Sequence, residues 1–152
     1  MNIGNVIITI VIIMALLGVI YYLATRSIGP TNLQTSKPLV YKDLIKITDP
    51  VGDQGVVNPI IVRGEARGNW YFEASFPITV TNENGSILAE SFAQAQGEWM
   101  TTEYVPFEGK IIITSDKVPA TGSNIIIIFR KDNPSGLPEN NDSISLKVKY
   151  GS

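Results

Sequence analysis

The sequence predicts an all-β fold, a β-sandwich of seven or eight strands, preceded by one transmembrane α-helix. Three observations lead to this prediction. The first 25 residues carry no charged side chain, whereas 12 Lys or Arg and 14 Asp or Glu follow. From residue 43 on, apolar and polar residues alternate with period two, as in half-buried strands. Clusters of Gly, Pro, Asn and Asp separate these runs, and no run keeps a helical period over three turns.

The apolar segment at residues 3–24 is long enough to cross a bilayer. As a helix it would extend about 33 Å, against roughly 30 Å for the hydrocarbon core. Tyr21 and Tyr22 fit the aromatic belt at the lipid–water interface. A cleaved secretory leader is the alternative, because Ala24, Thr25 and Ser27 are small, but the start of the chain has no basic residue. We therefore expect an uncleaved anchor at 1–26 and a single membrane pass.

Residues 27–42 mix Gly, Pro, Ser, Thr and Asn, which predicts an extended linker, and residues 43–152 then form the folded domain. Arg26, Lys37 and Lys42 follow the apolar segment, and the positive-inside rule applied to them favours a cytoplasmic domain. Two observations favour the opposite orientation. The N-terminal tail is short, and the rest of the chain has a composition typical of a stable β ectodomain. We predict a cytoplasmic-membrane protein whose C-terminal domain lies outside the cytoplasm.

The strands are predicted from the period-two runs in chain order. We expect them at residues 45–48, 60–63, 70–81, 86–95, 99–104, 107–114, 124–130 and 144–150. Residues 82–85 (NENG) supply a hairpin turn. Residues 125–129 (IIIIF) are apolar on both registers, which indicates a central strand or a strand covered by a loop. Pro77 lacks an N–H, so its strand is expected at a sheet edge or with a bulge there.

Three consecutive aromatics open the strand predicted at 70–81. Trp70, Phe72 and Phe76 share one register and are expected to fill the core, since a buried aromatic removes about 150–250 Å² from water. Tyr71 and Glu73 fall on the other register. They are candidate binding residues, although an ordinary solvated sheet face predicts the same pattern.

Trp99 is a third candidate for a binding face. A large aromatic on an envelope domain can stack on sugar rings, but packing between sheets explains it too. The segment 132–142 (DNPSGLPENND) offers hard oxygen ligands for Ca²⁺. Because it lacks the spacing of a calcium-binding loop, a plain connecting loop is the favoured interpretation. We predict no metal site and no cofactor.

Composition excludes several functional classes. The chain has no Cys and no His, which removes thiolate nucleophiles, the usual proton shuttle and the commonest zinc ligands. It contains no nucleophile elbow, phosphate-binding loop or dinucleotide fingerprint. Six Glu and no base lie between residues 68 and 109, which disfavours nucleic acid. We predict that the protein is not an enzyme and leave its oligomeric state open.

Three stretches then point to a family: N-P-I-x-V-x-G-x-A at 58–66, F-E-A-S-F at 72–76 and D-N-P-S-G-x-P-E at 132–139. From about Ile45 to Tyr150 the chain resembles the immunoglobulin-like domain family of bacterial spore germination. The resemblance implies an immunoglobulin-like sandwich in bacterial envelope proteins, with no assigned activity and no established binding residues to carry over. The chain shows no second domain like that of the germination proteins, so we predict no role in spores.

The resulting expectation is a non-catalytic, membrane-tethered, extracytoplasmic immunoglobulin-like module. It would bind or adhere to an envelope protein or a cell-wall polymer and contact the membrane through residues 3–24. An alternative is a structural subunit of a membrane-associated envelope assembly, although Ala15, Gly18 and Ala24 lack the small-x-x-x-small spacing that favours helix packing in lipid. A glycan-processing enzyme with a carboxylate pair is a minor alternative.

Overall fold

The computed structural model describes residues 37–151, together with part of the N-terminal segment: Ile3, Gly4, Ile12, Met14, Ala15, Leu17, Gly18 and Tyr22, all helical. The chain separates into two compact units, Met1–Thr35 and Ser36–Ser152. Within the residues so described, no helix is both long and apolar enough to cross a bilayer. Most of the predicted anchor, and residues 27–36 of the predicted linker, lie outside the described residues.

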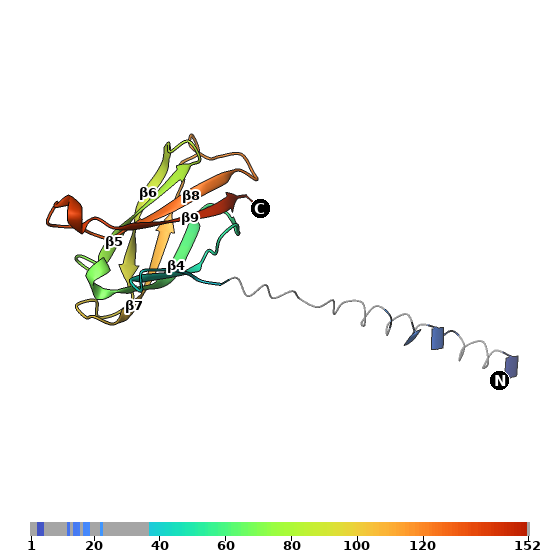
Figure 1. Ribbon diagram of the computed structural model, residues 1–152. Helices are drawn as coiled ribbons and strands as arrows, with labels where there is room; N and C mark the ends of the chain where they lie inside the picture. Colours follow the sequence, from blue (N-terminus) through green and yellow to red (C-terminus); the bar gives the residue numbers. More distant parts are fainter. Residues whose placement is uncertain are drawn as a thin grey trace. The chain divides into compact units, whose positions relative to one another are not determined.

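The unit Ser36–Ser152 is all β, as predicted (Figure 1). Its nine strands form one hydrogen-bonded sheet in the order β1-β2-β4-β7-β6-β5-β8-β9-β3, not two separate sheets of seven or eight strands in total. Two short 3₁₀ turns, η1 and η2, interrupt the connections. The elements are β1(Leu39–Tyr41), β2(Ile45–Asp49), β3(Gly55–Val56), β4(Ile60–Arg67), η1(Gly68–Trp70), β5(Ser75–Asn82), β6(Ile87–Ala95), β7(Tyr104–Ile111), β8(Asn124–Arg130), η2(Pro138–Asn140) and β9(Ser143–Tyr150).

The sheet curls so that its two halves face each other. The halves β1-β2-β4-β7 and β6-β5-β8-β9-β3 are joined by a short ladder, from Ala93↔Gly109 to Ala95↔Phe107. Phe107 of β7 nevertheless contacts Phe129 of β8, with ring centroids 6.3 Å apart, although β6 and β5 separate these strands in the sheet. The curl therefore encloses one core, which buries the side chains that the sequence pattern assigns to the inner register.

The isoleucine-rich strand β8 confirms the prediction of a central strand. It lies between β5 and β9 and pairs with both along its length. Ile125, Ile127 and Phe129 are fully buried, and the outward-facing Ile126 and Ile128 are half-buried. Apolar residues on both faces of this strand are tolerated because neither of its edges is open.

The prediction that Pro77 marks an edge strand is wrong. β5 lies between β6 and β8. Its ladder with β8 begins at Ile78↔Phe129, so Pro77 lies outside that ladder and needs no partner on that side. The register irregularity of β5 falls elsewhere, between Val80 and Thr81.

Other strand boundaries also differ from the prediction. β1 lies within the predicted linker and pairs with β2. β4 continues through Gly64 to Arg67, because Gly64 is a point of close approach and not a strand end. A Cβ on Gly64 would lie 2.7 Å from the Phe107 ring and would also overlap the Lys46 carbonyl oxygen. Residues 70–74 and 99–103 are not strands.

The motif at 58–66 is explained by the fold. The Asn58 side-chain amide donates to the Ile113 carbonyl at 2.8 Å, and its oxygen accepts from the Ile113 N–H at 3.0 Å. This amide therefore pairs with the backbone just beyond β7, as a strand residue would. Ile60, Val62 and Ala66 are buried in the core.

Candidate functional site

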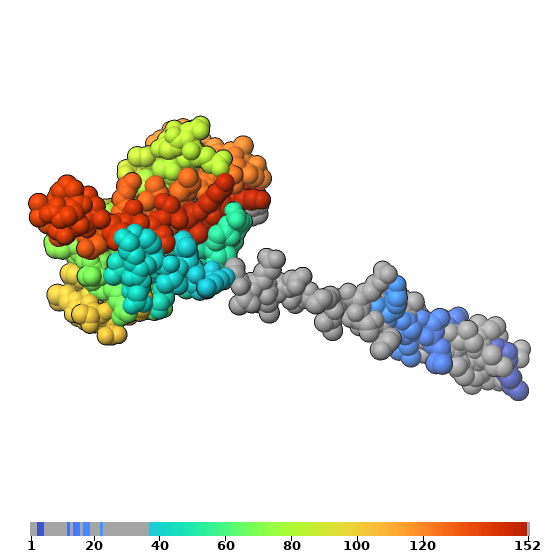
Figure 2. Space-filling model, in the orientation of Figure 1, coloured from blue at the N-terminus to red at the C-terminus, as the bar shows by residue number. Residues whose placement is uncertain are grey.

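Four connections meet at one end of the domain, which we call the distal end: residues 42–44, 68–74, 96–103 and 131–142. The opposite, proximal end is formed by residues 50–59, 83–86 and 112–123. β1 runs from Leu39 toward the distal end, and β9 runs away from it to Tyr150 (Figure 1). In Figure 2 loops 131–142 and 96–103 lie at the same end of the surface. The distal end is therefore the end away from both limits of the domain.

The turn between β1 and β2 has an uncommon backbone. Lys42 and Asp43 both have positive φ, 47° and 54°, and the Leu44 N–H closes the turn on the Tyr41 carbonyl at 2.8 Å. Left-handed backbone is costly for residues with a Cβ, so neighbouring contacts must hold this turn. It brings the Asp43 carboxylate to the end of β4.

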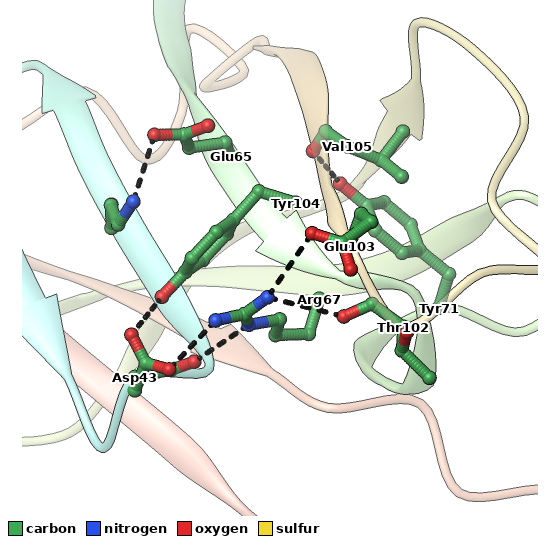
Figure 3. A network of polar contacts seen from close by, with 9 residues as sticks. Asp43, Glu65, Arg67, Tyr71, Thr102, Glu103, Tyr104 and Val105 are labelled. Atoms are coloured by element: carbon green, nitrogen blue, oxygen red, sulfur yellow. Dashed lines mark hydrogen bonds and ion pairs between the residues drawn. The ribbon is translucent and has the colours of Figure 1, made fainter.

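Arg67, at the end of β4, binds that turn (Figure 3). Its Nη2 donates to Asp43 Oδ2 at 2.7 Å and its Nε donates to the Asp43 carbonyl at 3.2 Å. Its Nη1 donates to the Thr102 carbonyl at 3.3 Å and lies 3.8 Å from a Glu103 carboxylate oxygen. One guanidinium thus connects the turn 42–44 with the loop 96–103.

Tyr104 lies between cationic and anionic groups of the same face. The centroid of its ring lies 3.5 Å from Lys46 Nζ and 4.0 Å from Arg67 Cζ. Its hydroxyl donates a hydrogen bond to Asp43 Oδ1 at 2.8 Å (Figure 3). The hydrogen bonds from Arg67 and Tyr104 lower the pKa of Asp43. Desolvation and then the bond to Asp43 raise the pKa of Tyr104. These charges satisfy one another, so the group is a structural clamp.

The structure overturns the expectation that Tyr71 faces solvent. Its side chain is 4% exposed, and its hydroxyl donates to the Val105 carbonyl at 2.7 Å. Burial raises the pKa of the phenol. The parity argument fails because η1 and a turn occupy residues 70–74, where the predicted strand 70–81 begins, so alternate residues no longer face opposite sides. Tyr71 is therefore part of the core, together with Trp70, which is fully buried as predicted.

Phe72 and Glu73 lie at the distal surface. Phe72 is 40% exposed, which corrects the expectation that it fills the core. Phe72 and Ser75 close a tight turn by two backbone hydrogen bonds of 3.0 and 3.1 Å, and its inner residues, Glu73 and Ala74, have φ of 49° and 60°. Glu73 is exposed, as predicted, but it lies in this turn and not on a sheet face.

Trp99 lies in the loop 96–103, half-buried against the core. Its side chain is packed, but its carbonyl and that of Thr101 lie directly over Gly68. A Cβ on Gly68 would overlap both oxygens. Residue 68 must therefore be glycine for the loop to lie against η1.

Three adjacent depressions open at the distal end. The first, about 420 Å³, is lined by Tyr41, Arg130, Lys131, Asn141, Asp142 and Ser143. The second, about 280 Å³, is lined by Lys42, Asp43, Leu44, Arg67, Asn69, Thr101 and Thr102. The third, about 330 Å³, is lined by Asn69, Tyr71, Phe72, Lys131, Asp132, Asn133, Pro134, Ser135 and Asn140. Shared residues make them neighbours, so they form one irregular surface.

The loop 131–142 uses much of its polarity internally. The Asn133 amide donates to the Leu137 carbonyl and to the Asn141 side chain, both at 2.8 Å, and Ser135 bonds to Asn133. Among the residues that the structure describes, no group of three or more acidic side chains could hold a metal ion. The carboxylates of this loop are thus not gathered into a group of that kind.

Exposed apolar and acidic side chains share the distal surface. Met100 is 75% exposed and Leu137 50%, in addition to Phe72. The four connections carry seven acids and two lysines: Asp43, Glu73, Glu98, Glu103, Asp132, Glu139 and Asp142, with Lys42 and Lys131. Such a surface offers hydrogen bonds, charge and apolar contact, which is the chemistry of binding.

Sequence reasoning did not identify the residues that organise this end. Asp43, Arg67 and Tyr104 are far apart in the chain, and β2, β4 and β7 bring them together. The parity of Arg67 and Tyr104 does place both on the outer face, but only their pairing in the ladder makes them neighbours.

Comparisons with known proteins bear on the family of the chain. No curated protein and no solved structure matches it. A family model described as the immunoglobulin-like domain of bacterial spore germination matches residues 44–136, more than half of the chain and most of the curled sheet. The chain therefore belongs to the immunoglobulin-like domain family of bacterial spore germination.

Proposed function

We propose that this protein is a non-catalytic, membrane-tethered module that binds an envelope protein or a cell-wall polymer outside the cytoplasm. The observation that carries the proposal is the arrangement of the distal end. Four connections and three depressions gather there, away from both limits of the domain.

The chemistry of the distal end supports binding over catalysis. The chain has neither His nor Cys, and the strongest charge cluster, around Arg67, consists of groups that bond to one another. Strained backbone in the turns at Lys42 and Glu73 is held by surrounding contacts, as in preorganised recognition loops. A rigid surface loses less conformational entropy when it binds.

A second candidate is a structural subunit of a membrane-associated assembly. It is favoured by β6, which pairs with β7 only over Ala93–Ala95 and leaves Ile87 and Phe92, 48% and 55% exposed, beside an open edge. An open edge can accept a further strand. Glu90 lies on this stretch and opposes edge-to-edge association of identical copies.

Site-specific photocrosslinking in intact cells would test the proposal. A benzoylphenylalanine at Met100 samples the distal end, and one at Ile112, 61% exposed, samples the proximal end as a matched control. We expect adducts with an envelope component from position 100 and few from position 112. Adducts only from position 112, or from neither, would contradict binding at the distal end.

Two further measurements separate the alternatives. Copies joined to one another through residues 3–24, with no distal adduct, would favour the assembly. External protease should degrade the C-terminal domain in intact protoplasts, because we place it outside the cytoplasm. Protection until lysis would place it inside and remove the proposed partners.

A further inference from the structure

We propose that the first distal depression binds an oxyanion, a phosphate or carboxylate group carried by an extended polymer. The inference rests on the proposed binding role of the distal end and names the chemistry of its ligand. The depression is lined by polar residues from β1, from the end of β8, from the start of β9 and from the loop 131–142 between them. Its Arg, Lys, Asn and Ser side chains can all donate hydrogen bonds.

Arg130 is the central donor of this site. Its Nη1 donates to Thr79 Oγ1 at 2.9 Å, and Thr79 is 2% exposed on the neighbouring strand β5. This bond fixes one nitrogen of the guanidinium, while the side chain as a whole stays exposed. A guanidinium held in this way keeps further N–H groups for a planar oxyanion, which it can bind through two parallel bonds.

Lys131 supplies a second positive charge to the same depression. Neither Arg130 nor Lys131 has a carboxylate within ion-pair distance among the described residues. The second depression differs, because its cations Lys42 and Arg67 are both paired with carboxylates. Two cations without such a partner therefore meet at the first depression.

The one carboxylate that lines the site is already balanced. Asp142 accepts the Tyr41 hydroxyl at 2.8 Å and lies 3.4 Å from Lys42 Nζ. Burial opposes its ionisation, but these bonds outweigh it and lower the pKa of Asp142. With Arg130, Lys131 and Lys42 against Asp142, the local excess is two positive charges, in a chain of net charge −2.

The proposed function favours a polymer over a lipid headgroup, because it has the distal end bind a partner outside the cytoplasm. The depression opens at the distal end, away from both limits of the domain. Within that role the oxyanion is a phosphate or carboxylate of a wall polymer. Acidic residues elsewhere at the distal end, such as Asp132 next to Lys131, weaken this attraction, and salt at 0.1 M screens only those beyond about 10 Å.

Binding of defined anions to the full chain tests the proposal. The protein is placed in nanodiscs of neutral lipid and titrated with inorganic phosphate, with poly(glycerol phosphate) and with vesicles that contain phosphatidylglycerol. We expect saturable phosphate binding, with chemical-shift changes at residues 130–131 and 141–143, and tighter binding of the polymer. No saturable phosphate binding, or binding of the vesicles alone, would overturn the proposal.

A charge-matched pair of variants separates a site from general attraction. The double substitution Arg130→Gln and Lys131→Gln removes the proposed cations. The control, Lys110→Gln and Lys149→Gln, removes two cations that also lack a carboxylate partner among the described residues. We expect the first to weaken phosphate binding about tenfold or more and the second less than about twofold. Equal losses of phosphate affinity in the two double variants would rule out a specific site.

The outcome is distinguishable from that of the proposed function. Crosslinks from position 100 that survive the loss of Arg130 and Lys131 would leave the binding module standing and remove the oxyanion site. Phosphate binding without any distal crosslink would support the oxyanion site and contradict the binding module.

Discussion

The two ends of the domain reverse the chain with different residues. At the distal end the left-handed positions are taken mainly by residues with a Cβ, with φ of 47° to 60°: Lys42, Asp43, Glu73 and Ala74. At the proximal end glycines take most of them, with φ of 74° to 84°: Gly85, Gly122 and Gly151. Gly136 at the distal end and Asp53 at the proximal end are the exceptions.

This difference indicates what each end depends on. A glycine turn needs little support, because glycine adopts positive φ without strain. The distal turns depend on contacts from elsewhere, such as the bonds of Arg67 to Asp43 and of the Ala95 N–H to the Ala74 carbonyl at 2.8 Å. The distal end is thus held by its neighbours, which fixes its shape.

The largest expected effect concerns the contact of η1 with the loop 96–103. Gly68→Ala should destabilise the domain by about 3 kcal/mol, because the new Cβ overlaps two carbonyl oxygens. Gly97→Ala is the control, since nothing lies within 4 Å of a Cβ there. Equal midpoints in urea unfolding for the two variants would show that the distal loop can shift away without loss.

A smaller effect is expected from a buried hydroxyl. Tyr71→Phe removes the bond to the Val105 carbonyl and should cost about 1–2 kcal/mol. The proximal Tyr150 is also buried, but its hydroxyl makes no side-chain hydrogen bond to a described residue, so Tyr150→Phe should cost less than about 0.5 kcal/mol. Thermal unfolding of both variants measures the difference, and a larger loss for Tyr150→Phe would contradict this account.

The turn comparison predicts opposite signs at the two ends. Ala74→Gly should stabilise the domain by about 0.5–1 kcal/mol, because it relieves a left-handed alanine at φ 60°. Gly85→Ala should destabilise it by a similar amount, since φ is 82° although the space is open. The free energies of unfolding of the two variants test this prediction. A change of the same sign in both would contradict the comparison of the two ends.

The smallest effects are expected in acid. The bond from Arg67 lowers the pKa of distal Asp43, and the bond from Lys147 lowers that of proximal Glu83. Each carboxylate stabilises the folded state above its ordinary pKa, 3.8 or 4.5, and loses this as pH falls through its lower folded value. Asp43→Asn should therefore flatten the stability profile from about pH 3.8 downward, whereas Glu83→Gln should flatten it already from about pH 4.5 downward. Unfolding measured across acid pH tests the order.

Recognition of the strands from the sequence succeeded where one face is buried and the run is regular. β9 alternates strictly, with Ile144, Leu146, Val148 and Tyr150 buried, as period two predicts. The prediction failed at residues 70–74, where the same alternation of residue types belongs to η1 and a turn. Periodicity reports burial only once the backbone conformation is known, and local sequence did not distinguish the two conformations here.

The candidate site could be predicted only in part. Glu73 is exposed and Trp99 is half-buried, but Tyr71 is a core residue and the clamp of Arg67, Asp43 and Tyr104 was not foreseen. The depression around Arg130 was not foreseen either, since its lining comes from β1, β8, β9 and the loop 131–142. Such sites depend on which strands become neighbours, which no short-range pattern contains.

Hydrophobic pattern along the chain was sufficient to establish an all-β domain and, outside residues 70–74, which side chains fill its core. Apolar burial is the dominant favourable term, and period two assigns it face by face. The family motifs agreed with it. The order of the nine strands, the curl of the single sheet and the meeting of four loops at the distal end depend on contacts between residues distant in sequence. These contacts form only as the sheet closes on itself, so they are absent from any local stretch of the chain.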